Sequence, residues 1–343
     1  MLISWKPEFS NMKIFPRKGI FSLVNVRLFV ILLVLSCFVL LVPFFAGNYL
    51  VHVVIVTFYY IVVASSWNLL AGYTGLFSVA QNTFAGIGAY SSALFFIHVG
   101  VPPVIGIFMA AGVAAALSYG LGALTLKMKG MYLAISTWAF AGVVTVLVTG
   151  LVQYTGGELG LGVPYLFGTK QSYVPYYFVF FFLDVIVLAL IYVLLKSKVG
   201  LYMMAIREDE VAAKVMGLDT YKWKKNIFAL SGFFTGLSGA LLAHYIGLLS
   251  PAMFRFDEMV IIIIMAILGG IGHFAGPMMG AVTIELASEY LRAYGELRMI
   301  IFAILIIVIV TFFRDGLVGL VSRIQRILTR ARAHGQPLPE STT

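Results

Sequence analysis

The strongest constraint on this chain is a series of apolar runs that are separated only by short polar or glycine-rich segments. The longer runs hold enough residues to cross a hydrocarbon core of about 30 Å as helices. Because backbone polar groups in lipid must be satisfied within the segment, we expect helices throughout. The runs span residues 28–46, 49–70, 84–99, 102–126, 131–153, 174–196, 226–247, 258–271, 277–292 and 298–313. The sequence therefore predicts an all-α polytopic membrane protein.

Composition agrees with this class. Hydrophobic residues make up 61% of the 343 residues and charged residues only 11%, with a mean hydropathy of +1.01, whereas soluble domains carry about 25% charged residues. We expect about 8–10 transmembrane helices. The number is a range because the two glycine-rich regions, 71–99 and 258–292, could form either complete spans or re-entrant or split helices. The first run is too long for a signal peptide and lacks a cleavage site, so we interpret it as a retained anchor.

Lysines and arginines gather beside alternate apolar runs, which indicates the cytoplasmic side of a membrane. The loops near 47, 100, 155–173 and 248–257 have few of them. We therefore expect a cytoplasmic N-terminal segment at 1–27, a transmembrane domain at 28–313 with a cytoplasmic loop at 197–225, and a basic cytoplasmic tail at 314–343 whose end is disordered. The net charge of +9 follows this membrane pattern and not one soluble face, so nucleic-acid binding is excluded.

Several chemistries lack the residues that they need. A single cysteine, Cys37, rules out disulfides and a cysteine metal site. The sequence has no G-x-x-x-x-G-K-[ST], so any ATP hydrolysis must occur on another polypeptide. The histidines have no metal-site spacing, and no nucleophile motif occurs, so an enzyme has little support. These histidines are His52, His98, His244, His273 and His334.

Residues 207–217 read REDEVAAKVMG, a charged segment among apolar ones. Glu208, Asp209 and Glu210 would occupy a first helical turn, where the helix dipole favours acids. Glu210 can pair with Lys214 at i+4, and Gly217 suits the position after a helix end. The segment predicts a short helix that either lies on the lipid headgroups or presents its small apolar side to a groove on another protein.

The spacing V-A-A-x-x-x-G at 211–217 resembles the E-A-A-x-x-x-G coupling loop of ABC importer permeases, with Val211 in place of the glutamate and Glu210 one residue earlier. Three more stretches are similar to the M-type membrane subunit of the branched-chain amino acid permeases. They are NLLAGYTGLFSVAQNTFAGIGAY (68–90), KMKGMYLAISTWAF (127–140) and the block 199–281, which ends in ILGGIGHFAGPMMGA. In the family's order, they extend across about two thirds of the chain.

This resemblance implies that the 207–217 helix docks into a cleft on a cytoplasmic ABC ATPase. The implied ATPase-coupling residues are Arg207, Glu208, Asp209, Glu210, Val211, Ala212, Ala213 and Gly217. It also implies a second homologous permease subunit and an external substrate-binding protein as partners, in a prokaryotic plasma membrane, the inner membrane in a Gram-negative cell. ATP would bind to the ATPase, and this chain would hold no cofactor and no metal.

The two glycine-rich regions are candidates for the translocation path, because glycines let the backbone leave a helix while polar side chains satisfy the freed groups. Close helix packing explains the same pattern equally well. The spacing of Gly232, Gly236 and Ala240 is typical of such packing. Pro277 argues against one straight helix through the second region. The candidate path residues are Asn68, Gly72, Gly75, Ser78, Gln81, Asn82, Gly269, Gly270 and Gly272.

Ionisable residues within the runs are costly and usually face the protein interior. Asp184 stands alone mid-run, so we favour a protonated or hydrogen-bonded structural aspartate, or a partner contact, over an ion relay. Glu285 and Glu289 share a helix face with Arg292, which predicts an ion-pair cluster, and His244 is expected to be a satisfied interface residue. The stretch at 322–332 is basic and amphipathic and is expected to lie on the cytoplasmic leaflet.

Together these patterns predict the membrane permease subunit of an ATP-driven importer that receives its substrate from the external binding protein. By resemblance the substrates are leucine, isoleucine and valine. Two alternatives stay open: the same machinery carrying urea or short amides, and an ATP-independent channel or ion-coupled carrier.

Overall fold

The computed structural model describes residues 42–128, 130–168, 172–291, 295, 300–301, 304 and 316–319. The chain divides into two compact units, Met1–Gly47 and Asn48–Thr343, and the second contains all the elements below. Several predictions fall wholly or mostly outside the described residues: the runs at 28–46 and 298–313, the ion pair of Arg292, and the basic stretch at 322–332.

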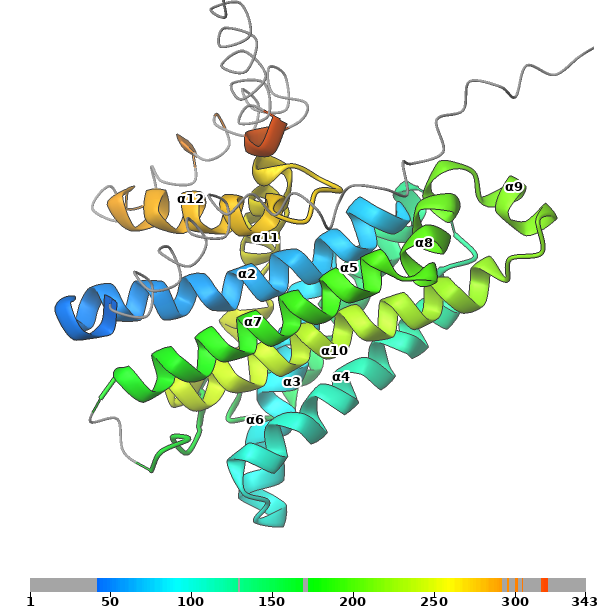
Figure 1. Cartoon of the computed structure of the whole chain (residues 1–343). Helices are drawn as coiled ribbons and strands as arrows, with labels where there is room; N and C mark the ends of the chain where they lie inside the picture. The colour runs from blue at the N-terminus through cyan, green and yellow to red at the C-terminus, as the bar shows by residue number, and fades with distance from the viewer. Residues whose placement is uncertain are drawn as a thin grey trace, which may run out of the picture. The chain divides into compact units, whose positions relative to one another are not determined.

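The described part of the second unit is built almost entirely of helices, which confirms the predicted all-α class (Figure 1). In chain order the elements are α2 (Asn48–Thr74), α3 (Gln81–Leu94), the π-helix η2 (Phe95–Val99), α4 (Pro103–Thr125), α5 (Met131–Gly150), α6 (Val152–Thr155), the 3₁₀ turn η3 (Gly157–Leu159), β1 (Leu161–Gly162), α7 (Val174–Lys196), α8 (Lys198–Glu208), α9 (Glu210–Val215), α10 (Thr220–Ile246), β2 (Leu248–Leu249), the 3₁₀ turn η4 (Pro251–Phe254), α11 (Phe256–Gly269) and α12 (Gly276–Tyr290).

Five helices among the described residues are long and apolar enough to cross a membrane: α2, α4, α5, α7 and α10. Each of them coincides with a predicted run, although α10 begins six residues earlier than expected. By contrast, α11 and α12 have 14 and 15 residues, too few to span about 30 Å at 1.5 Å per residue. Helix α3 also has 14 residues, but it continues directly into the five residues of η2. These short helices are the ones beside the two glycine-rich breaks.

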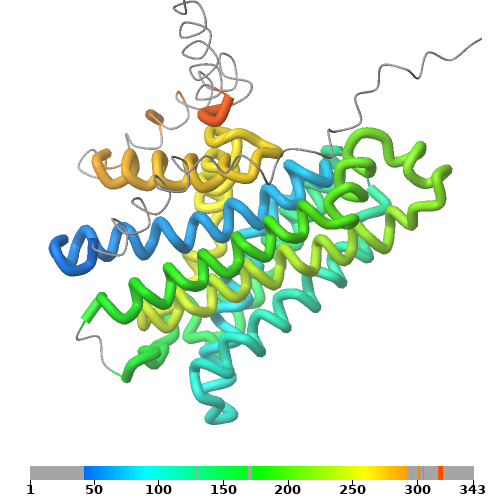
Figure 2. The backbone as a smooth tube through the Cα atoms, in the orientation of Figure 1, coloured from blue at the N-terminus to red at the C-terminus, as the bar shows by residue number. Residues whose placement is uncertain are grey.

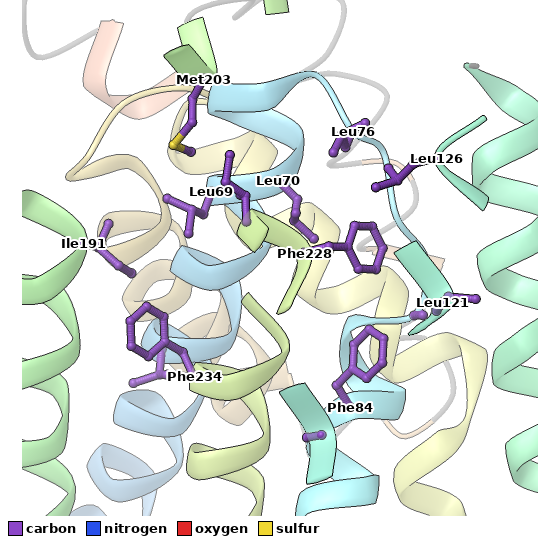
Figure 3. Close-up of a cluster of buried hydrophobic side chains, with 14 of the residues drawn as sticks. Leu69, Leu70, Leu76, Phe84, Leu121, Leu126, Ile191, Met203, Phe228 and Phe234 are labelled. Carbon is purple, nitrogen blue, oxygen red and sulfur yellow. The ribbon is translucent and has the colours of Figure 1, made fainter. Parts of the chain in front are cut away.

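Helix α10 lies at the centre of the unit and packs against α2, α3 and α4 (Figures 1 and 2). Small residues allow the close approach, as predicted: a Cβ on Gly232 would meet Ser118, and one on Gly236 would meet Ala114. Large side chains fill the space around this contact, and Figure 3 shows Phe84, Phe228 and Phe234 in the resulting cluster. The bundle is therefore fixed by backbone proximity as well as by apolar burial.

Both glycine-rich regions interrupt a helix. The chain is non-helical at residues 75–80, between α2 and α3, and again at residues 270–275, between α11 and α12. Pro277 lies in the first turn of α12, where a missing N–H costs nothing. The prediction that one helix does not run straight through this region is confirmed.

The segment between α10 and α11 is more than the connecting loop that the sequence predicted. It pairs β2 with β1, with Leu161 opposite Leu249, and then runs along α3 through η4. Asn82 donates to the carbonyl of Met253, and the ring of Tyr90 lies 5.7 Å from that of Phe254. This path brings the start of α11 beside α5, where the Trp138 and Phe256 rings are 5.9 Å apart.

Candidate functional site

The short helix α9 is defined by strong signals at both ends. Asp209 is its N-cap, and its Oδ1 accepts hydrogen bonds from the N–H groups of Val211 at 2.8 Å and Ala212 at 3.0 Å. At the other end Gly217 has φ of 84°, and the bonds Leu218 N–H to Ala213 O and Gly217 N–H to Lys214 O form a Schellman motif. The predicted short helix and its terminal glycine are confirmed.

The start of this helix differs from the prediction in one respect. The sequence placed Glu208, Asp209 and Glu210 in one first turn, whereas Glu208 closes α8 and Asp209 is extended, with φ of −153°. The reason is that Asp209 bonds the free N–H groups of α9 with its side chain and therefore takes the non-helical N-cap conformation. The segment is thus two helices joined at Asp209.

Glu210 anchors α9 to the start of α10. Its carboxylate lies 2.9 Å from the Lys214 ammonium, which confirms the predicted i,i+4 pair, and 2.6 Å from that of Lys224. The Thr220 hydroxyl donates a third bond at 3.2 Å. Partial burial alone would raise the pKa of Glu210, but the hydrogen bonds from Lys224 and Lys214 outweigh burial and lower the pKa to about 2. The acid therefore holds the loop together.

The opposite side of α9 is apolar and exposed. Val211, Val215 and Met216 are 62%, 81% and 86% exposed, and Ala212 is exposed between them, whereas Ala213 is buried against the chain. Such an exposed apolar patch on a well-capped helix is typical of a docking surface. We name Val211, Val215 and Met216 the α9 patch.

Arg207 points away from the α9 patch. From the last turn of α8, its Nη1 donates a 2.5 Å hydrogen bond to the carbonyl of Gly72, in the last turn of α2. A Cβ on Gly272, in the second break, would lie only 2.7 Å from the same Nη1. The guanidinium therefore caps α2 and adjoins the second break, while the stem of the side chain adjoins the first: a Cβ on Gly75 would lie 3.6 Å from Arg207 Cγ.

Asn68 joins the same two segments. Its Nδ2 donates to the carbonyl of His273 at 3.1 Å, and its Oδ1 accepts from the N–H of Gly272 at 2.8 Å. Gly72 lies so near that a Cβ there would be 2.6 Å from the Gly272 nitrogen. The end of α2, the 270–275 segment and α8 thus form one junction of backbone groups tied by Asn68 and Arg207.

The remaining candidate path residues have different positions. Gln81 donates to the Ser231 hydroxyl at 2.8 Å and to Thr235, so it ties α3 to α10. Ser78 is fully buried, and its carbonyl accepts from the Trp67 indole at 2.7 Å. Gly75, Gly269 and Gly270 form the edges of the breaks, with φ of 73° at Gly75 and 122° at Gly270.

Of these candidates, Asn82 borders a cavity of about 330 Å³ between α3, α5 and the start of α11. Sequence reasoning did not find this cavity, because residues 248–257 read as a plain connection. A signal was available in Arg255 and Asp257, two charges directly before an apolar run.

Four ionisable residues from the sequence reasoning lie elsewhere. His244 is fully buried and bonded on both nitrogens, to the Ser92 hydroxyl at 2.8 Å and the Pro164 carbonyl at 2.7 Å, so it is a satisfied interface residue as expected. Asp184 is buried on α7, and its Oδ1 has no partner among the described residues. Glu285 and Glu289 lie half-buried on α12.

The described residues hold no cluster of three or more histidine, cysteine or acidic side chains that could bind a metal. The apolar spans, the broken short helices and the exposed, capped helix α9 are features of a multi-pass membrane transport protein. The family model described as "branched-chain amino acid transport system / permease component" matches residues 49–310. The chain belongs to this family, and is an importer permease of the ABC class rather than an enzyme.

Individual relatives of this chain are also named as import or transport permeases. The high-affinity branched-chain amino acid transport system permease protein LivM of Salmonella typhimurium is 29% identical over 86% of this chain and 75% of its own length. The probable LivM of Methanocaldococcus jannaschii is 23% identical over 68% of this chain and 79% of its own. The fructose import permease protein FrcC of Rhizobium meliloti is 26% identical over 57% and 58%. No solved structure gives a significant match.

Proposed function

We propose that this chain carries branched-chain amino acids across a prokaryotic plasma membrane, powered by ATP hydrolysis on a separate ABC ATPase. The supporting observation for the substrate is the family match over residues 49–310 together with the relatives named for these amino acids. The chain itself carries no P-loop sequence, so the nucleotide belongs to the partner.

The α9 patch is the surface that suits the ATPase. Helix α9 is capped at both ends and carries three exposed apolar side chains, so it can insert as a rigid unit into a groove on a soluble partner. This assignment puts α8 and α9 on the cytoplasmic side, as the lysines and arginines of the 197–225 loop predict. The charge pattern of the sequence predicts the same side for both chain termini. An external binding protein and a second, homologous permease complete the assembly.

Arg207 connects the proposed docking helix to the membrane domain, so a movement of α9 can be transmitted through it. It is two residues from the N-cap of α9 and holds the last turn of α2, beside Gly272 of the second break. A displacement of α9 by the ATPase therefore acts directly on the ends of two broken helices. Rigid elements with such breaks are where alternating-access transporters move.

Reconstitution tests the proposal. The tagged chain is purified gently from its native membrane, its companions are identified by mass spectrometry, and the assembly is placed in vesicles with its binding protein. We expect a P-loop ATPase, a second permease and ATP-dependent leucine uptake. The Val215→Asp variant should lose the ATPase, while Ser172→Asp, at an exposed position in the loop before α7, serves as a control for added charge.

Competition identifies the substrate. Unlabelled isoleucine and valine should reduce leucine uptake, whereas urea, short amides, fructose and ribose should not. The two sugars are included because FrcC and a ribose import permease are also similar to this chain. Uptake that persists after ATP depletion would instead support the channel or ion-coupled carrier.

A further inference from the structure

The cavity beside Asn82 has the size and position of a small-molecule site. Its volume is about 330 Å³, near the lower end for ligand pockets. The walls come from the first break and α3, from one face of α5, and from η4 and the start of α11. The lining includes Val79, Asn82, Thr83, Ala141, Arg255 and Met259.

The cavity lies at mid-depth in the membrane domain. On α5, its lining begins at Trp138, the eighth residue of this 20-residue span, and ends at Val146, the sixteenth. The span is about 30 Å long at 1.5 Å per residue, so the cavity adjoins its central part. The segment 248–256 reaches this depth because it runs along α3 before α11 begins.

One charged residue, Arg255, lines the cavity, and its ion-pair partner Asp257 stands beside the lining. The Arg255 Nε atom lies 3.0 Å from Asp257 Oδ1, and the two side chains are 67% and 32% exposed. An exposed arginine at the depth of the hydrocarbon core does not face lipid, because a charge there is costly. This face must therefore meet water or another protein, and the face of α5 with Ile135, Trp138 and Val146, each more than half exposed, continues it.

The chemistry of the lining matches a zwitterion with an aliphatic side chain. Arg255, in the lining, can pair with a carboxylate, and its partner Asp257, beside the lining, can pair with an ammonium group when the two side chains exchange their mutual ion pair for the zwitterion. Val79, Ala141 and Met259 offer apolar surface for the side chain, and the Asn82 and Thr83 amide and hydroxyl groups can fix its orientation.

We propose that this cavity is the intramembrane contact site for the transported amino acid, with the second permease subunit closing it on the α5 side. The inference rests on the proposed function and adds to it: selection of the zwitterion continues within the membrane after the binding protein has released it.

Cysteine labelling tests this site, because Cys37 is the chain's single cysteine and its replacement gives a clean background. Gly142→Cys is the reporter, since no atom lies within 4 Å of a Cβ at this position. Ser172→Cys, in an exposed loop before α7, is the matched control. A charged methanethiosulfonate reagent is applied to the complete transporter with binding protein and ATP, with and without leucine.

The expected result is that the reagent labels Gly142→Cys and that leucine slows this labelling several-fold but leaves Ser172→Cys unaffected. The inference is overturned if Gly142→Cys imports leucine yet its thiol does not react, or reacts at the same rate with leucine present. Thr145→Cys replaces the reporter if Gly142→Cys does not assemble. Failure of the unmodified transporter to import leucine would overturn the proposed function itself, which separates the two results.

Discussion

The guanidinium of Arg207 caps the last turn of α2 through the carbonyl of Gly72, at 2.5 Å, although 135 residues separate them in sequence. The bond joins the helix next to the α9 patch to the point where α2 ends and the first break begins. Because Gly272 adjoins the same guanidinium, one side chain from the loop meets both breaks. This junction is the structural basis for transmission in the proposed importer.

Arg207→Gln should uncouple the transporter. The variant loses the charge-assisted bond to Gly72, worth about 1.5–3 kcal/mol, but leaves the α9 patch intact. We expect the ATPase still to bind and to hydrolyse ATP, while leucine uptake per ATP hydrolysed falls. The measurement is the ratio of the two rates in vesicles, with Lys222→Gln, an exposed cation at the start of α10, as the control. An unchanged ratio in Arg207→Gln would remove this residue from the transmission route.

The two lysines that hold Glu210 should contribute unequally. Lys224 is 7% exposed and 2.6 Å from the carboxylate, whereas Lys214 is 54% exposed. An exposed i,i+4 pair contributes about 0.3–0.5 kcal/mol, and a hydrogen bond to a charged group about 1.5–3 kcal/mol. Lys224→Gln should therefore lower the apparent Tm of the purified chain more than Lys214→Gln. Equal Tm changes would contradict the assignment of Lys224 as the main anchor.

The same carboxylate gives a pH prediction. Glu210 has its pKa lowered to about 2 from an ordinary 4.5, so the folded state favours the ionised form. Its contribution to stability is complete above the ordinary pKa and is lost as the pH falls from about 4.5 towards 2. The Tm difference between the native chain and Glu210→Gln should be constant at neutral pH and shrink across this range. A difference that grows on acidification would mean that Glu210 is not stabilised as an anion.

Gly217 allows a test of α9 without removal of any contact. Its φ of 84° strains a residue with a Cβ, although no atom lies within 4 Å of that Cβ. The left-handed conformation costs an ordinary residue about 1–2 kcal/mol, and asparagine tolerates it better. Gly217→Val should weaken ATPase binding more than Gly217→Asn, with both chains folded. Measured ATPase affinities that are equal in the two variants would show that the Schellman end of α9 is unimportant for docking.

The elements that sequence predicted well were those whose signals are local. The apolar runs matched α2, α4, α5, α7 and α10, and Gly217 and Pro277 took the positions that their backbone preferences favour. These features depend on hydropathy and allowed dihedral angles, which can be read from a few neighbouring residues.

Long-range contacts could not be read in this way. Lys224 looked like one more basic residue of the 197–225 loop, yet the turn after α9 returns it to Glu210. Likewise, the path of residues 248–256 along α3 depends on the hydrogen bond from Asn82 to the Met253 carbonyl, 171 residues away in sequence, and no periodicity links the two residues. The cavity follows from this path, so no local pattern could have predicted it.

Asp184 distinguishes the ATP-driven importer from an ion-coupled carrier. It is 4% exposed on α7, and its Oδ1 has no hydrogen-bond partner in the part of the chain that the structure describes. An ion-coupled carrier would need this acid to take up and release a cation, so Asp184→Asn would abolish its transport. In the proposed importer, the free energy of ATP hydrolysis reaches the chain through α9 and not through Asp184. Asp184→Asn, which keeps the side-chain shape, should therefore leave ATP-dependent leucine uptake intact. Uptake by reconstituted vesicles with and without ATP measures this directly, and loss of uptake in a folded Asp184→Asn chain would favour the carrier.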